Sequence, residues 1–271
     1  MPRISYVNGH YVPHAQAAVH IEDRGYQFSD GVYEVIGVFR NGLIDGEKHL
    51  DRLQRSLNEL RITPPTGRHS LKFILQETLR RNYIQDGKIY IQISRGVATR
   101  DHPFPAVAES SIIVTASSYI WPTAEEAKAG NAVVTGPDLR WQRCDIKSVS
   151  LLPNVLAKQR AKEVGAAELW MTDDQGCVTE GTAANAWIVM PDNEIITRQA
   201  DNGILSGITR HTLIQLIEKE AYKLSLRPFT VDEAKSAKEA FFSSSTATVK
   251  PVISIDGVSV GNGVPGEITC Q

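Results

Sequence analysis

The stretch VYEVIGVF, residues 32–39, points to the fold class because its side chains alternate between two faces, as they do along an extended strand. Both faces carry apolar groups, so we expect both to be covered. Two stretches with helical spacing follow, residues 50–60 and 71–79, in which apolar side chains recur every three or four positions. These apolar stripes predict two helices that each bury one face in a core shared with the strand.

The next part of the sequence predicts further strands and then a linker. Strands are expected at residues 88–94 and from Ser111 onward. Residues 120–130, IWPTAEEAKAG, combine Pro with small and charged residues between two apolar strands, which is typical of a connection between domains. We therefore predict a smaller α/β domain at residues 1–120 and a larger one at residues 121–271.

The second half alternates short strands with turns. Helices are predicted near residues 155–164 and at GITRHTLIQLIEKE, residues 207–220, and the strands between them are separated by turns such as DDQG and PDNE. This pattern predicts a largely antiparallel sheet. Together the two halves favour an α+β fold of two domains.

Composition excludes several classes of protein. The chain of 271 residues has a formal net charge of −2 and no basic stripe that would follow a phosphate backbone, so nucleic acid is not an expected partner. No apolar run approaches the ~20 residues that span a bilayer, and the N-terminus lacks a secretory signal, so we expect a cytoplasmic protein without a membrane partner. Three cysteines without C-x-x-C spacing and seven histidines without H-E-x-x-H spacing predict neither a disulfide framework nor a metal site.

A lysine in an apolar setting is the first candidate for chemistry. Lys147, in CDIKS, follows Ile146 and precedes the run VSLL. An ammonium group is rarely buried without a partner or a function, and a lowered pKa makes a lysine nucleophilic. Glu180, in VTEG, follows 33 residues later and supplies an acidic partner for a pyridine nitrogen. Taken alone, Lys147 is as readily explained by a structural role.

Three segments have the groups that bind a phosphate. Gly207, Ile208 and Thr209 open a helix, whose free N–H groups attract an anion. The run SSST at residues 243–246 ends an apolar strand with a series of hydroxyl groups, and Arg52 flanks the first helical stripe. Each signal alone also fits a helix cap, a polar loop or a surface arginine. Their joint occurrence with Lys147 favours a phosphate-bearing cofactor.

The chain resembles the fold-type IV pyridoxal-phosphate aminotransferases, and among them it is most similar to the D-amino acid aminotransferases. The motifs that carry the resemblance cover nearly the whole chain in order: EDRGYQFSDGVYE, EKHLDRL, RWQRCDIKS, LLPNVLAKQRAKEVGAAE, VTEGTAANAW, GILSGITR and FFSSSTATVKPVISIDG. The resemblance implies pyridoxal 5'-phosphate as cofactor, with Lys147 as the Schiff-base lysine and proton shuttle and Glu180 as the partner of the pyridinium nitrogen. It also implies phosphate or ring contacts from Arg52, Leu205, Ile208, Thr209, Ser245 and Thr246.

The same resemblance implies the substrates. Tyr33 with Arg100 and His102 would bind the carboxylate of a D-amino acid, and Val35 would shape the pocket for its side chain. The reaction is of the type D-alanine plus 2-oxoglutarate to pyruvate plus D-glutamate, with ping-pong kinetics. In this family the loop that carries Arg100 comes from the neighbouring subunit, which implies a homodimer. Read from the residues alone, Arg100 to His102 also fits a solvated loop stiffened by prolines.

Two departures from the family pattern and several alternatives remain. Residues 182–184 read Thr-Ala-Ala where relatives often carry more hydroxyls, which implies a thinner hydrogen-bond network around the cofactor. The sequence stops at GEITCQ, so the family's last helix is expected to be absent or replaced. The alternative functions are a branched-chain or R-amine transaminase of the same fold, an aminodeoxychorismate lyase, and a binding protein without catalytic activity.

Overall fold

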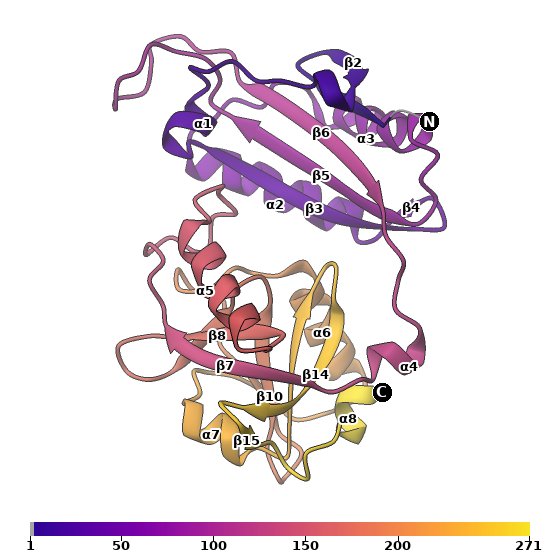
Figure 1. Cartoon of the computed structure of the whole chain (residues 1–271), viewed down its shortest axis with the longest axis vertical. Helices are drawn as coiled ribbons and strands as arrows, with labels where there is room; N and C mark the ends of the chain where they lie inside the picture. The colour runs from indigo at the N-terminus through magenta and orange to yellow at the C-terminus, as the bar shows by residue number, and fades with distance from the viewer. Residues whose placement is uncertain (1–2) are drawn as a thin grey trace. The chain divides into compact units, whose positions relative to one another are not determined.

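The computed structural model describes residues 3–271, which divide into two compact units (Figure 1). The first unit comprises the chain through Trp121 together with the short segment Ile146–Ser150, and the second comprises Pro122–Asp145 and Leu151–Gln271. Each unit has its own sheet and its own helices. The predicted α+β class is confirmed.

A six-stranded antiparallel sheet, in the order β2-β1-β6-β5-β3-β4, forms the first unit. β3 (Gly31–Phe39) pairs with β5 (Gly87–Ser94) in a register that sets Tyr33 opposite Gln92. Both were predicted as strands from their alternating side chains. The remaining strands are β1 (Ile4–Val7), β2 (His10–Pro13), β4 (Gly42–Leu43) and β6 (Ser111–Ser118).

Helices cover one face of this sheet (Figure 1). α2 (Gly46–Glu59) packs on β3 and α3 (Arg68–Arg81) packs on β6 and β1, with the predicted apolar stripes buried. On the other face of β3, Tyr33 and Val35 are half-buried and Phe39 is exposed, so the expectation that both faces are covered is wrong for the isolated chain. The unit also contains the 3₁₀ turn η1 (His14–Gln16) and the short helix α1 (Arg24–Phe28).

The segment Ile146–Ser150 belongs to the first unit although the chain before and after it belongs to the second. Ile146 is buried in the core of the first unit. The backbone N–H of Tyr33 donates to the carbonyl of Lys147 at 3.0 Å, and the N–H of Val149 donates to Gly31 at 3.0 Å. The expected division into residues 1–120 and 121–271 places this segment in the second domain, whereas its backbone pairs with β3.

The second unit is built on a nine-stranded sheet in the order β12-β11-β10-β13-β14-β7-β8-β9, with β15 paired to β14. β7 (Asn131–Pro137) runs parallel to both of its neighbours and β11 runs parallel to β12, while the other pairs are antiparallel. The sheet is therefore antiparallel in most of its pairs but parallel around β7. Its other strands are β8 (Glu168–Thr172), β9 (Val178–Gly181), β10 (Asn185–Val189), β11 (Ile195–Thr197), β12 (Leu224–Leu226), β13 (Glu239–Ser244), β14 (Thr248–Ile255) and β15 (Val258–Ser259).

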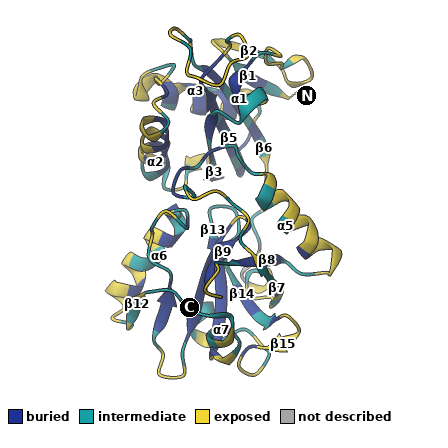
Figure 2. Cartoon of the chain, turned by 90° about the vertical axis from the view of Figure 1, so that its left-hand side faces the viewer, coloured by how far each residue is buried: buried dark blue, intermediate teal, exposed yellow. Residues whose placement is uncertain are grey.

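Helices lie around this sheet, and its strands β8, β9, β10, β11 and β13 are buried along nearly their whole length (Figure 2). α5 (Leu152–Glu163) packs on β8 and β7 and is followed by Gly165, whose φ of 72° a glycine adopts without strain. α6 (Ile208–Lys219) packs on β13 and begins directly after Gly207, within the predicted start at residues 207–209. The shorter helices are α4 (Ala124–Ala127), α7 (Val231–Ser236) and α8 (Glu267–Cys270). Among residues 3–271, no helix has the length and apolarity needed to cross a membrane.

Candidate active site

Lys147 lies beside the outer face of β3 in the first unit. Its Nζ donates to the hydroxyl of Tyr33 at 3.3 Å and lies 4.3 Å from the centroid of the Tyr33 ring. Among the described residues no carboxylate forms an ion pair with this amine, and the side chain is half-buried. The hydrogen-bond partner of the amine is therefore a neutral hydroxyl group. The arrangement is suited to an amine that has to react.

Arg52, predicted to bind phosphate, lies under β3 next to a buried carboxylate. Its Nε and Nη2 donate to the two oxygens of Glu34 at 2.7 and 2.8 Å, and Nδ1 of His49 lies 2.7 Å from the same carboxylate. Burial raises the pKa of Glu34, but the charge and hydrogen bonds of Arg52, the bond to His49 and the charge of Lys147 outweigh it and lower the pKa to about 2. Glu34 therefore fixes the orientation of Arg52. From the sequence alone Glu34 was visible only as a glutamate within an apolar strand, and this role was not predicted.

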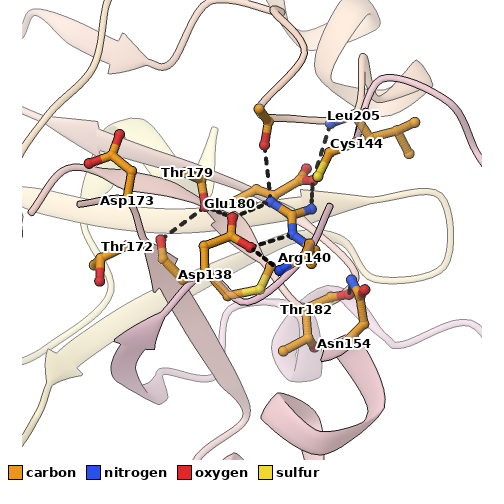
Figure 3. Close-up of polar contacts among 12 residues, drawn as sticks. Asp138, Arg140, Cys144, Asn154, Thr172, Asp173, Thr179, Glu180, Thr182 and Leu205 are labelled. Carbon is orange, nitrogen blue, oxygen red and sulfur yellow. Dashed lines mark hydrogen bonds and ion pairs between the residues drawn. The ribbon is translucent and has the colours of Figure 1, made fainter. Parts of the chain in front are cut away.

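Glu180 lies on β9, and both of its carboxylate oxygens accept hydrogen bonds (Figure 3). Oε1 accepts from Arg140 and from the backbone N–H of Leu205 at 3.1 Å, and Oε2 accepts from the amide of Asn185 at 3.0 Å. The residue is buried in the second unit. A buried carboxylate with this many donors is held in one orientation.

Arg140, which the sequence reading did not assign, joins Glu180 to a second carboxylate (Figure 3). Its Nη2 donates to Asp138 at 2.7 Å and to the carbonyl of Gly203 at 3.0 Å. Burial lowers the pKa of Arg140, but the hydrogen bond to Asp138 and the charges of Glu180 and Asp138 outweigh it, so the pKa is raised. Asp138 and Arg140 stand two positions apart just after β7, a spacing found in many surface loops, and that is why sequence reasoning missed them.

The start of α6 lies close to the same network. Asn185, which donates to Glu180, also donates to the carbonyl of Leu205 at 3.0 Å. A Cβ at Gly207 would lie 2.1 Å from Oδ1 of Asn185, so only glycine fits there. In the described chain no side chain caps the first turn of α6, where Ile208 and Thr209 lie. The N–H groups of this turn are consequently placed to receive an anion.

The four hydroxyl residues at the end of β13, residues 243–246, differ in their contacts. The hydroxyl of Ser243 accepts from the indole of Trp187 at 2.9 Å in the core, and that of Ser244 accepts from the N–H of Ala247 at 3.1 Å. Ser245 and Thr246 follow in the half-buried turn that leads to β14. These two, which the sequence reading selected, are the members of the run that leave the strand.

Residues 182–184, where the sequence departs from the family pattern, form a turn that is held by hydrogen bonds. The hydroxyl and the backbone N–H of Thr182 both donate to the buried carboxylate of Glu168, and Asn154 of α5 donates to the carbonyl of Thr182 at 2.8 Å. The turn after Glu180 is therefore fixed from two sides even though Ala183 and Ala184 have no hydroxyl groups. The thinner hydrogen-bond network expected around the cofactor stays a prediction.

The residues expected to bind the substrate do not meet within the described chain. Tyr33 contacts Lys147 and the ring of Tyr90, 5.8 Å away, and Val35 lies on the same half-buried face of β3. Arg100 and His102 instead contact Phe28, with the guanidinium 4.9 Å and the imidazole 5.5 Å from its ring centroid.

The predicted residues fall into two sets, one in each unit. The first unit holds Tyr33, Val35, Arg52, Arg100, His102 and Lys147, and the second holds Glu180, Leu205, Ile208, Thr209, Ser245 and Thr246. The second set combines a fixed buried carboxylate, an uncapped helix start and a hydroxyl turn, which together fit a pyridine ring that bears a phosphate. The first set supplies an amine with a neutral partner.

This chain belongs to the amino-transferase class IV family, whose model matches residues 31–255. It is 40% identical over 265 residues to the D-alanine aminotransferase of Bacillus licheniformis, covering 97% of this chain and 92% of that protein. It is 39% identical over 267 residues to the D-alanine aminotransferase of Staphylococcus haemolyticus, covering 98% and 94%. The branched-chain amino acid aminotransferase of Escherichia coli superimposes with a TM-score of 0.91 at 23% identity, covering 99% of this chain and 91% of that one, which establishes the shared fold.

Proposed function

We propose that this aminotransferase moves the amino group of D-amino acids, with D-alanine as a representative donor, to a 2-oxo acid. The observation that carries the proposal is the similarity to D-alanine aminotransferases along 97–98% of the chain. Tyr33 and Lys147 lie in two of the motifs that carry the resemblance, and Arg100 and His102 lie in the loop between β5 and β6. Pyridoxal 5'-phosphate, the cofactor of this family, supplies a carbonyl that accepts the amino group and a ring that accepts electrons from Cα.

Lys147 would hold the cofactor and move the proton. Its amine donates a hydrogen bond to the hydroxyl of Tyr33, which directs it toward the outer face of β3. It would take the proton from the substrate Cα and deliver it again on the cofactor side. The contact between the Lys147 carbonyl and β3 keeps the backbone at this position fixed.

Glu180 would face the ring nitrogen and keep a proton on it. Glu180 and Asp138 share the guanidinium of Arg140, and we expect the negative charge of Glu180 to act on the ring nitrogen. That charge favours a protonated ring nitrogen. Leu205 would pack against the ring, and its N–H already fixes Glu180 at 3.1 Å.

The phosphate would be bound by the first turn of α6, at Ile208 and Thr209, together with Ser245 and Thr246. Arg52 would add a charged donor, with its orientation set by Glu34.

The substrate carboxylate would be bound by Tyr33, Arg100 and His102, and Val35 would limit the side-chain pocket. Because Arg100 and His102 lie against Phe28 and not against Tyr33 in one described chain, we propose a homodimer in which the loop of one subunit completes the site of the other. We also place the enzyme in the cytoplasm, where its three free cysteines would stay reduced.

The experiment is a half-reaction screen of the cofactor-loaded enzyme with D-alanine, L-leucine and an R-amine, followed by bleaching of the cofactor absorbance. Reaction with D-alanine and its loss in Arg100→Ala are expected. Reaction with L-leucine that survives Arg100→Ala favours the branched-chain reading, and pyruvate formed from aminodeoxychorismate without an amino acceptor favours the lyase.

Lys147→Ala tests the amine itself. Borohydride should fix the cofactor to the peptide that contains Lys147 in the native enzyme and label nothing in Lys147→Ala. Label on another lysine contradicts the assignment. A protein that stays colourless with added pyridoxal phosphate and does not react with any of these substrates is the expected result for a binding protein without activity.

A further inference from the structure

The loop that carries Arg100 and His102, residues 96–105, is bonded at its base to the segment that leads into α1. The N–H of Arg24 donates to the carbonyl of Gly96 at 2.9 Å, the N–H of Ala98 donates to Glu22 at 3.4 Å, and Asp23 and Val97 form an isolated β-bridge. Asp23 caps α1 by accepting from the N–H of Gly25 at 2.8 Å. The motif EDRGYQFSDG, which contains these residues, has no other role in the proposed mechanism.

Arg24 reaches from α1 into the middle of this loop. Its Nη1 donates to the carbonyl of Asp101 at 2.6 Å, and its Nη2 donates to the carbonyl of His102 at 3.2 Å. Its Nε donates to Asp30 at 2.9 Å, and the side chain is buried. A planar guanidinium held at Nε has its other N–H groups in fixed directions, so Arg24 sets where the two carbonyls lie.

Asp30 is itself fixed by a second arginine. Arg95 donates to its two oxygens at 2.7 and 2.9 Å, and the guanidinium of Arg95 lies 3.6 Å from the centroid of the Phe104 ring. Burial raises the pKa of Asp30, but the bonds from Arg95 and Arg24 outweigh it and lower the pKa, so the carboxylate is ionised at neutral pH. The 96–105 loop is thus held at its base, at two central carbonyls and at Phe104.

Phe28, the last residue of α1, contacts the two side chains that the loop presents. Its ring centroid lies 4.9 Å from the guanidinium of Arg100, 5.5 Å from the ring of His102 and 4.8 Å from the guanidinium of Arg24. A cation over an aromatic face at an exposed site is attracted only weakly, which is enough to favour one rotamer but not to fix a loop. The backbone bonds of Arg24 therefore place the loop, and Phe28 orients the side chains on it.

We propose that α1 is the positioning element for carboxylate recognition, with Arg24 setting the backbone of the 96–105 loop and Phe28 orienting Arg100 and His102. The proposal rests on the proposed function for the identity of the ligand, a substrate carboxylate. Neither Arg24 nor Phe28 contacts the substrate or the cofactor in this account. Their effect on the reaction comes from holding the two side chains that do.

The test compares Arg24→Lys and Phe28→Leu with two matched controls in the same unit. Arg40 lies over the exposed ring of Phe39 at 5.1 Å, remote in sequence from the 96–105 loop, so Arg40→Lys and Phe39→Leu make the same chemical changes without the loop contacts. Lysine at position 24 keeps the charge near Asp30 but does not span two carbonyls. Phe28→Leu, at a half-buried position, covers the case in which Arg24→Lys does not fold.

Two measurements are made on each cofactor-loaded variant. Hydrogen exchange of residues 97–105 should accelerate at least tenfold in Arg24→Lys and stay at the native rate in Phe28→Leu and in both controls. The concentration of D-alanine that half-saturates the half-reaction should rise roughly 10-fold to 100-fold in Arg24→Lys and less in Phe28→Leu, with the limiting rate within about twofold of the native rate and cofactor affinity unchanged.

If Arg24→Lys folds and its residues 97–105 exchange at the native rate, Arg24 does not set the loop. If the half-saturating concentration of D-alanine is unchanged in Phe28→Leu, Phe28 does not orient Arg100 and His102. Equal effects in the control variants overturn both, because they would show a general loss of stability. A native enzyme that does not react with D-alanine overturns the proposed function instead, and the exchange comparison still decides whether Arg24 holds the loop.

Discussion

Each unit of the molecule buries one carboxylate against an arginine, and the two arrangements differ in charge. In the first unit, Glu34 takes up the Nε and Nη2 donors of Arg52, with His49 on the same carboxylate. In the second unit, Glu180 shares Arg140 with Asp138. The first group has one carboxylate for one guanidinium, whereas the second has two.

This difference separates a structural ion pair from one suited to cofactor chemistry. A balanced pair such as Glu34 and Arg52 can be buried because each charge satisfies the other, and removing either partner leaves an uncompensated charge. Around Arg140 two carboxylates share one guanidinium, and the charge of Arg210 also acts on Glu180. The comparison predicts that Glu34 matters mainly to stability and Glu180 mainly to activity.

The largest expected effect is on stability. Glu34→Gln leaves Arg52 buried without its charge partner and should lower the free energy of unfolding by about 3–5 kcal/mol, measured by urea titration of the apoprotein. Glu77→Gln is the matched control, because the pKa of Glu77 is also lowered to about 2, but its partners Arg80 and Arg81 are exposed to solvent. A loss in Glu77→Gln as large as that in Glu34→Gln would contradict the importance of burial.

The same carboxylate should also make the stability of the protein depend on pH in acid. The pKa of Glu34 lies at about 2 in the folded protein against 4.5 for the free side chain, so its contribution is complete above about pH 4.5 and is lost as the pH falls toward 2. The shift corresponds to about 3 kcal/mol. The urea midpoint of the native protein should fall steeply across this window, and the midpoint of Glu34→Gln should fall less steeply. Parallel curves would show that other groups control acid unfolding.

Glu180→Gln should affect turnover more than stability. Glutamine keeps the hydrogen-bonding shape but removes the charge that would hold a proton on the ring nitrogen, so the D-alanine half-reaction should slow by about 100-fold or more. The urea midpoint should change little because Asp138 still pairs with Arg140. Glu239→Gln is the control: this buried carboxylate accepts from the N–H groups of Ile268 and Thr269, so its loss should reduce stability and leave the half-reaction intact. If Glu180→Gln lost mainly stability and Glu239→Gln lost mainly activity, the distinction drawn between the two units would be wrong.

The smallest expected effect comes from the second carboxylate on Arg140. Asp138→Asn removes the negative charge of that carboxylate and should slow the half-reaction about tenfold, equivalent to one pKa unit at the ring nitrogen. Asp173→Asn is the control, since Asp173 lies in the same unit and pairs with Arg198 at 2.8 Å. An unchanged rate in Asp138→Asn would show that Glu180 acts without help from its neighbours.

Local pattern was enough to predict most of the secondary structure. The alternation in residues 32–39 and the leucine stripe of α2 predicted elements that the structure contains, because strand and helix periodicities are properties of the backbone. The start of α6 at Gly207 was also predicted, and the structure adds the reason that Asn185 leaves no room for a Cβ. The choice of Ser245 and Thr246, with Arg100 and His102, rested on the resemblance and stays a prediction.

Other features depended on contacts between distant segments. Nothing in the sequence near Arg140 marks it as the partner of Glu180, because the pair forms only when the residues that follow β7 lie beside β9. Arg24 gave no signal either, since its partners are the carbonyls of Asp101 and His102, and carbonyls are present at every residue.

The sequence alone determined the α+β class, the two amphipathic helices and the family, because each of these is encoded in local periodicity or in motifs that can be read in order. Only the tertiary structure decided that Lys147 pairs with the first unit, that Glu34 orients Arg52, and that Glu180 shares its arginine with Asp138. These are charges and hydrogen bonds between residues far apart in the chain, and their strength depends on burial and distance, which no linear pattern records.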